Sequence, residues 1–187
     1  TRVSGADAPA VKPILGDFKG SNFFKNKSSL FSLGIKIAFA DVDRDSGAIT
    51  AESIEPLITK NTKAISVVHL GGWPADMIGI KSLAKKYNLK LIEDCSQAHG
   101  SGIFDNNLKH FKSVGSFGDI NTWSFCQDKI ISTGGEGGMI TTNNSNLMEK
   151  VWSLKDHGKS KKLVDASASN YSFKWIHNDF GSNFRLT

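Results

Sequence analysis

A lysine between an apolar segment and a glycine cluster is the first candidate for chemistry. Lys129 follows strand-like residues that end at Phe125, and it precedes four glycines in the segment 134–138. A lysine held just past a strand end and partly withdrawn from water loses its proton easily and can attack a carbonyl group. This setting suggests imine chemistry at Lys129, although a lone lysine is usually an ordinary surface side chain.

An aspartate occupies a similar place after another apolar segment. Residues 90–94 (Lys-Leu-Ile-Glu-Asp) predict a strand that ends at Asp94. In open parallel sheets, ligands bind beyond the carboxyl ends of the strands. We therefore expect Asp94 and Lys129 at the same edge of a sheet, while Asp94 alone would also suit a turn.

The elements that must position these residues alternate along the chain. Segment 64–70 is a near-continuous apolar run, which is typical of a strand covered on both faces. The helical segment 76–88 that follows it is amphipathic. This alternation predicts right-handed crossovers and an α/β fold with a mainly parallel sheet. Strands are predicted for segments 35–42, 64–70, 90–94, 122–125 and 139–142, and helices for segments 51–58, 76–88 and 146–157.

Three other stretches lack a regular pattern. Residues 1–34 are interrupted by glycines and prolines and stay unassigned. Segment 100–117 is predicted to be a long polar connection, and the lysine- and serine-rich segment 159–170 a surface loop.

The composition restricts the class of protein. The chain has 187 residues, 39% of them hydrophobic, which describes one globular domain with a real core. The net charge of +5 comes from scattered lysines, so no nucleic-acid-binding stripe is expected. No apolar run is long enough to span a membrane, and no signal peptide is recognised. Two distant cysteines, Cys95 and Cys126, favour a reducing cytoplasm, and no cluster suggests a metal site.

Three ordered segments resemble the DegT/StrS-type sugar aminotransferases, which are pyridoxal-phosphate enzymes of the aspartate aminotransferase superfamily (fold type I). Ser124-Phe125, Lys129 and the Gly-Glu-Gly-Gly of residues 135–138 are similar to the family's cofactor-lysine segment. Residues 93–100 (Glu-Asp-Cys-Ser-Gln-Ala-His-Gly) resemble its acidic cofactor segment, and residues 175–185 its G-x-N-x-R segment. The resemblance runs from about Phe39 to the last residue.

The resemblance implies a cofactor and a role for each matching residue. Lys129 would form the Schiff base with pyridoxal phosphate and then move a proton, and Asp94 would pair with the pyridinium nitrogen. Gln97 matches a position near the cofactor ring, and Ser124 matches a phosphate-binding serine. Asn183 matches a residue that reaches the cofactor phosphate of the neighbouring subunit, which implies a homodimer with shared active sites.

The resemblance also implies a fold and a reaction. Residues 35–187 would form part of the large domain, a three-layer α/β/α structure, without the small C-terminal domain. The family transfers an amino group, commonly from glutamate, to a keto sugar attached to a nucleotide. The alternative is a truncated or degenerate relative that binds a nucleotide sugar or a partner chain without catalysis. A generic nucleotide-binding α/β domain is disfavoured because no G-x-G-x-x-G or P-loop follows an early strand.

Several polar residues near these segments receive no catalytic role. His99 is expected to be a structural histidine with its hydrogen bonds satisfied. His69 ends a strand and could border the pocket. Arg185 suits either a substrate contact or a surface ion pair.

Overall fold

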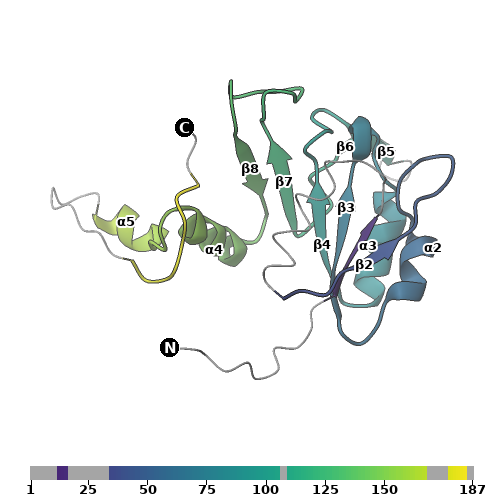
Figure 1. Cartoon of the computed structure of the whole chain (residues 1–187), viewed down its shortest axis with the longest axis horizontal. Helices are drawn as coiled ribbons and strands as arrows, with labels where there is room; N and C mark the ends of the chain where they lie inside the picture. The colour runs from purple at the N-terminus through teal and green to yellow at the C-terminus, as the bar shows by residue number, and fades with distance from the viewer. Residues whose placement is uncertain (1–11, 17–33, 106–108, 168–176, 185–187) are drawn as a thin grey trace.

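The described part of the chain is built around one mainly parallel sheet. The computed structural model describes residues 12–16, 34–105, 109–167 and 177–184 (Figure 1). Within them, the sheet has the strand order β2-β1-β3-β4-β7-β8, and every neighbouring pair is parallel except β7 with β8. Its strands are β1 (Lys12–Gly16), β2 (Ala38–Ala40), β3 (Thr62–Val68), β4 (Lys90–Asp94), β7 (Ile120–Ser124) and β8 (Gly138–Thr141). The α/β class with a mainly parallel sheet is therefore confirmed.

Side-chain caps fix where the helices begin. At α2 (Ala51–Ile54), Thr50 and Ser53 form a reciprocal capping box, with serine in the place usually taken by glutamate. Asp76 accepts from the Gly79 N–H at 3.0 Å and Asn144 from the Leu147 N–H at 3.1 Å, so both cap the helices that follow them. The helices are α2 (Ala51–Ile54), the 3₁₀ turn η1 (Glu55–Leu57), the short turn η2 (Leu70–Gly72), α3 (Met77–Lys86), α4 (Ser145–Lys155) and α5 (Lys161–Ser167).

The core lies between one face of the sheet and α3. Along β3 and β4, buried residues alternate with less buried ones, as expected when one face of each strand packs against a helix. Each large apolar side chain buried there contributes about 1.5–3 kcal/mol of transfer free energy. The central members of this core are Ile65, Val67, Met77, Ile80, Leu83, Ala84 and Leu91.

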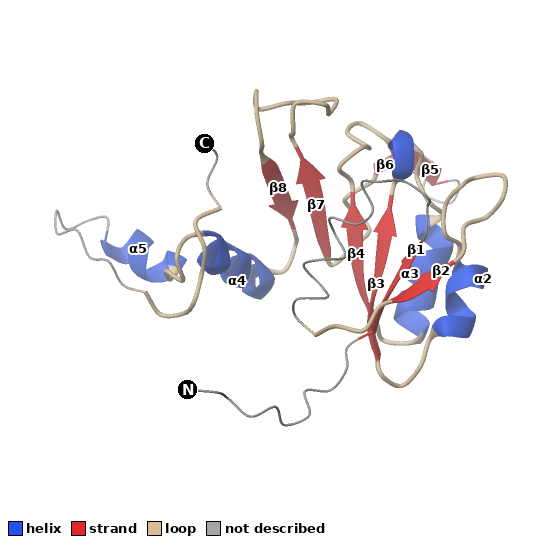
Figure 2. Ribbon diagram, viewed as in Figure 1, coloured by secondary structure: helices blue, strands red, loops and turns tan. Residues whose placement is uncertain are grey.

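The other face of the sheet is covered less completely. Val68, Ile92, Asp94 and Thr122 alternate with the core residues and are only partly buried. In Figure 2, α4 and α5 lie beyond the β8 edge of the sheet. The second helical layer of the expected three-layer structure is therefore not seen in the described segments.

Three segments of the chain differ from the sequence prediction. Segment 100–117 contains an antiparallel hairpin of β5 (Gly102–Asp105) and β6 (His110–Ser113), where a polar connection was expected. The predicted loop 159–170 contains α5. β1 lies in the unassigned N-terminal segment and pairs with both β2 and β3. Pro13 hides this strand in the sequence, and the register shifts beside it, where the missing N–H would otherwise break the ladder.

The described helices include none that is long and apolar enough to cross a membrane.

Candidate active site

Two neighbouring strands end in the predicted cofactor residues. Asp94 is the last residue of β4, and its register partner on the adjacent strand β7 is Thr122. Ser124 is the last residue of β7, two positions farther along. Register partners and alternate residues share a face of the sheet. Asp94, Thr122 and Ser124 therefore lie on the less covered face, at the carboxyl edge expected to bind ligands.

The loop between β7 and β8 carries Lys129 in a defined conformation. The Lys129 N–H donates to the Cys126 carbonyl oxygen at 3.0 Å, and the Thr133 N–H donates to the Phe125 carbonyl oxygen at 3.0 Å. The Lys129 side chain is only 14% exposed, and its Nζ lies 3.1 Å from Asp128 Oδ1. The hydrogen bond from Lys129 lowers the pKa of the Asp128 carboxyl group below its ordinary value. The Lys129 side chain is thus largely withdrawn from solvent and forms an ion pair with its neighbour Asp128.

Ser124 and Gln97 each keep donor capacity after their local hydrogen bonds. Ser124 Oγ accepts from the Cys126 N–H at 3.3 Å, so its own hydrogen can be donated to a ligand. Gln97 Oε1 accepts from the Gly71 N–H at 2.8 Å, which directs the amide oxygen toward the turn after β3. The Gln97 amide group can donate in turn. Asp94 Oδ1 accepts from the Ser96 N–H at 3.0 Å, which orients the carboxylate.

Asn183 lies apart from these residues. Its backbone forms an isolated bridge with Asp156, the residue that ends α4, and its side chain is exposed. The described structure therefore attaches Asn183 to α4 rather than to the ends of β4 and β7. Of the matching segment 175–185, residues 175–176 and Arg185 lie outside the described residues.

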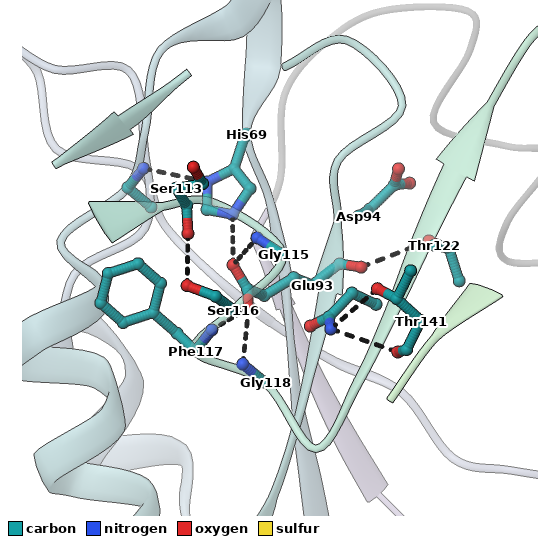
Figure 3. A network of polar contacts seen from close by, with 12 residues as sticks. His69, Glu93, Asp94, Ser113, Gly115, Ser116, Phe117, Gly118, Thr122 and Thr141 are labelled. Atoms are coloured by element: carbon teal, nitrogen blue, oxygen red, sulfur yellow. Dashed lines mark hydrogen bonds and ion pairs between the residues drawn. The ribbon is translucent and has the colours of Figure 1, made fainter. Parts of the chain in front are cut away.

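A buried polar cluster lies on the face of β4 opposite to Asp94 (Figure 3). Glu93 and His69 are both fully buried, and His69 Nε2 is 3.0 Å from Glu93 Oε2. The Glu93 carboxylate also accepts from the backbone N–H groups of Gly115 and Phe117, each at 2.8 Å, and of Gly118 at 2.5 Å. Burial opposes ionisation, but these hydrogen bonds outweigh it and lower the pKa of Glu93.

Sequence reasoning left His69 without a role and did not single out Glu93. Both residues stand near the end of a predicted strand: His69 follows Val68, and Glu93 precedes Asp94. Two such residues on consecutive parallel strands are placed side by side by the sheet, and this was the available signal.

The same cluster does not suit a metal ion. Ligand atoms of His69, Glu93 and Cys95 lie within 4.8 Å of one another. However, His69 Nδ1 already accepts from the Ala75 N–H at 3.2 Å, and Nε2 faces the carboxylate. Burial, followed by the charges of Glu93 and Asp94, raises the pKa of the Cys95 thiol. Without a metal ion, the Cys95 thiol therefore stays protonated and is a poor nucleophile.

His99 was expected to be a structural histidine with satisfied hydrogen bonds, and the second half of that expectation is wrong. Its ring packs against Trp123 and Phe125, with centroid distances of 5.4 and 5.6 Å. Both ring nitrogens are buried without a hydrogen-bond partner among the described residues. Both ring contacts are tilted, with interplanar angles of 48° and 37°.

Comparisons with known proteins identify the same family as the resemblance does. The family model described as the DegT/DnrJ/EryC1/StrS aminotransferase family matches residues 20–187, so the match begins well before Phe39. A curated relative from Acidithiobacillus ferrooxidans, named UDP-N-acetyl-3-dehydro-alpha-D-glucosamine 3-aminotransferase, is 43% identical over 136 residues. That alignment covers 73% of this chain and 35% of the relative, so this chain spans about a third of the relative's length.

Solved structures agree with this assignment. An aminotransferase from Psychrobacter cryohalolentis superimposes with a TM-score of 0.83 at 46% identity, covering 96% of this chain and 43% of that chain. NtdA from Bacillus subtilis, solved with the bound cofactor PMP, superimposes with a TM-score of 0.74 at 28% identity, covering 94% and 35% of the two chains.

Proposed function

Because this chain belongs to the DegT/DnrJ/EryC1/StrS aminotransferase family, we propose that it supplies the cofactor lysine of a pyridoxal-phosphate-dependent sugar aminotransferase. The arrangement of Asp94, Ser124 and Lys129 is the observation that carries this proposal. A carboxylate and a hydroxyl lie at the ends of adjacent strands on one face, and a shielded lysine lies in the loop that follows. These are the groups that pyridoxal phosphate requires from a protein.

The residues present fit this cofactor. Asp94 provides an oriented anion for the pyridine nitrogen, and Ser124 provides a hydroxyl donor for the phosphate. Gln97 follows Asp94 by three residues, and its amide nitrogen is available to donate to a ring substituent. When bound, the cofactor supplies an electron sink for the substrate carbon. Lys129 Nζ would hold the cofactor covalently, and its amine would then serve as a general base.

The substrate that we propose is a keto sugar linked to a nucleotide, with an amino acid such as glutamate as the amino donor. The Acidithiobacillus relative is named for a UDP-linked 3-dehydro sugar, which supports this class. The amino donor rests on the family resemblance described above.

We also propose that the working unit is a homodimer with shared active sites. Asn183 is exposed and attached to the end of α4, so it is available to a second subunit. In this proposal, residues 35–187 form part of the large domain of each subunit.

Trapping the cofactor on its lysine tests the function. The protein that carries this sequence is incubated with pyridoxal phosphate, reduced with borohydride, and mapped by peptide mass spectrometry. We expect an adduct at residue 129 in the wild type and in the control Lys150→Ala, which removes an exposed lysine of α4. We expect no specific adduct in Lys129→Ala. Adducts scattered over surface lysines would refute the proposal and favour a non-catalytic relative.

Mixing two inactive variants tests the shared site. Lys129→Ala and Asn183→Ala are each expected to lower transamination of a nucleotide keto sugar. If Asn183 serves the neighbouring subunit, a hybrid dimer holds one site with both residues intact, so mixing restores activity. Failure of the mixture to recover activity would contradict the shared site while leaving the role of Lys129 in place.

A further inference from the structure

The Glu93 carboxylate is the point where four hydrogen-bond donors meet. Oε2 accepts from His69 Nε2 and from the Gly115 N–H, and Oε1 accepts from the N–H groups of Phe117 and Gly118. These donors come from the end of β3 and from the turn before β7. A single buried side chain thus joins three consecutive strands of the sheet at the level of the candidate active site (Figure 3).

The surroundings of His69 assign the proton on its ring. Nδ1 receives the N–H of Ala75 at 3.2 Å, so Nδ1 is an acceptor and carries no hydrogen. Nε2 must then carry the hydrogen and donate it to Glu93. The imidazole is neutral in this arrangement, and both of its nitrogens are used.

His69 also contacts the segments that carry two candidate cofactor residues. Its backbone N–H donates to the carbonyl oxygen of Asp94 at 3.1 Å. The turn that begins after it brings the Gly71 N–H to Gln97 Oε1 at 2.8 Å. Gly71 has φ 60°, a left-handed conformation that glycine adopts at little cost and that this turn requires.

We propose that Glu93 and His69 are positioning residues that fix the Asp94 carboxylate and the Gln97 amide against the cofactor ring. The inference rests on the proposed function, because it assigns a purpose to the pair only if pyridoxal phosphate binds at this edge. Glu93 accepts the hydrogen bond from His69 Nε2 and so fixes the position of His69. The backbone N–H of His69 donates to the Asp94 carbonyl oxygen, and the turn after His69 contacts Gln97. Neither member of the pair touches the cofactor.

Burial of this pair is better explained by positioning than by stability alone. A buried carboxylate bears a large desolvation cost, and a buried polar pair is often no more stabilising than well-packed apolar side chains. Hydrogen bonds, unlike apolar contacts, specify direction. Asp94 and Gln97 need direction, because a ring nitrogen and a ring substituent must each meet one atom of the protein.

Two substitutions of His69 separate the contact with Glu93 from the rest of the side chain. In His69→Gln, the amide nitrogen occupies the place of Nε2 and can still donate to Glu93, while the contact with Ala75 is lost. In His69→Asn, the amide oxygen occupies the place of Nδ1 and can accept from Ala75, while the contact with Glu93 is lost. The two variants thus keep opposite contacts, and asparagine is in addition one methylene group smaller than glutamine.

The first measurement needs no cofactor. Hydrogen exchange at the Gly71 amide reports whether the turn still reaches Gln97. We expect protection in the wild type and in His69→Gln, and faster exchange in His69→Asn. A role limited to overall stability would speed hydrogen exchange at all amides of the sheet together, without a separate effect at the Gly71 amide.

The second measurement is pyridoxal-phosphate affinity, determined by absorbance titration at a temperature where circular dichroism shows each variant to be folded. By analogy with residues that support metal ligands, we expect His69→Asn to bind on the order of tenfold more weakly and His69→Gln to stay within about twofold of the wild type. Equal affinity in all three proteins would overturn the inference. Equal loss in both variants would overturn it as well, because ring volume rather than the Glu93 contact would then matter.

The outcomes also separate this inference from the proposed function. A wild type that captures no cofactor on Lys129 refutes the function, and the purpose assigned to the pair is refuted with it. A wild type that captures the cofactor, together with a His69→Asn variant that binds it equally well, refutes only the positioning role.

Discussion

Replacing Glu93 by glutamine is the sharpest test of the buried network, because it preserves shape and changes only hydrogen-bonding capacity and charge. Each carboxylate oxygen accepts two of the four donors. The glutamine amide must place its NH₂ group where one of those oxygens was. In either orientation of the amide, two of the four donors then face its NH₂ group instead of an acceptor oxygen.

The expected cost follows from those two orphaned donors. A buried donor left without an acceptor costs about 1–3 kcal/mol, so Glu93→Gln should lose roughly 2–6 kcal/mol of unfolding free energy. Domains are typically stable by only about 5–15 kcal/mol, so this loss is a large fraction of the total. For a chain of this length the melting temperature should fall on the order of 10 °C.

The effect should depend on pH with a definite sign. The native pKa of Glu93 is lowered from its ordinary value of 4.5, because hydrogen bonds from His69 and the backbone outweigh the effect of burial. A carboxyl group with a depressed native pKa stabilises the fold fully above its unfolded pKa, and this stability is lost as the pH falls through the native value. The difference between the wild type and Glu93→Gln should therefore be complete at neutral pH and shrink below about pH 4.5.

Urea unfolding followed by circular dichroism at neutral and acidic pH measures both effects. Glu52→Gln is the matched control, because Glu52 is an exposed glutamate in the first turn of α2. Its effect should stay within about 0.5 kcal/mol. A Glu93→Gln variant no less stable than this control would show that the carboxylate is not the acceptor for the four donors.

Two further predictions concern close packing and thiol reactivity. A Cβ added at Gly118 would lie 2.6 Å from Asn121 Oδ1, so Gly118→Ala should cost about 1–3 kcal/mol in thermal unfolding. Gly135→Ala has no atom within 4 Å of the added Cβ and should be nearly neutral; equal effects of the two changes would contradict the packing argument. Cys95 is fully buried with a raised pKa, whereas Cys126 is partly exposed. Iodoacetamide should therefore modify Cys126 in the native protein and leave Cys95 unmodified, as peptide mass spectrometry can show, and rapid labelling of Cys95 would refute the burial.

The strands nearest the site were predictable because their sequences are locally distinctive. Segment 90–94 has an apolar pair followed by two acidic residues, and it forms β4 with the same bounds. Predicted strand 64–70 corresponds to β3, which begins two residues earlier and ends at Val68. In both, apolar content and length indicate a buried strand without knowledge of the partners.

The missed elements depend on pairing between distant residues. β1 has a proline and a glycine within five residues, and it becomes a strand only because β2 and β3 lie on either side of it. β5 and β6 likewise form a ladder only with each other, so each depends on its partner strand more than on its own sequence. Local propensity is a weak guide wherever such tertiary contacts decide the conformation.

The residues of the site also differ in whether local sequence or long-range pairing reveals them. Lys129 and Asp94 belong to local motifs, so their candidacy was evident from the sequence, and their roles stay predictions. The link between His69 and Glu93 joins residues 24 positions apart. It depends on the parallel register of β3 and β4, in which Val67 faces Glu93 and Val68 faces Asp94.

The alternation along β4 has a consequence for changes in chain length. Glu93 and Asp94 are adjacent carboxylates that point to opposite faces of the sheet, one into the buried cluster and the other toward the candidate active site. Insertion or deletion of a single residue within β4 would exchange the two faces. A deletion before Glu93 would bring the shorter aspartate to the donors gathered around Glu93, and an insertion there would bring the longer glutamate to the place of Asp94. We therefore expect a single-residue insertion or deletion in this strand to disrupt both the buried cluster and the candidate active site.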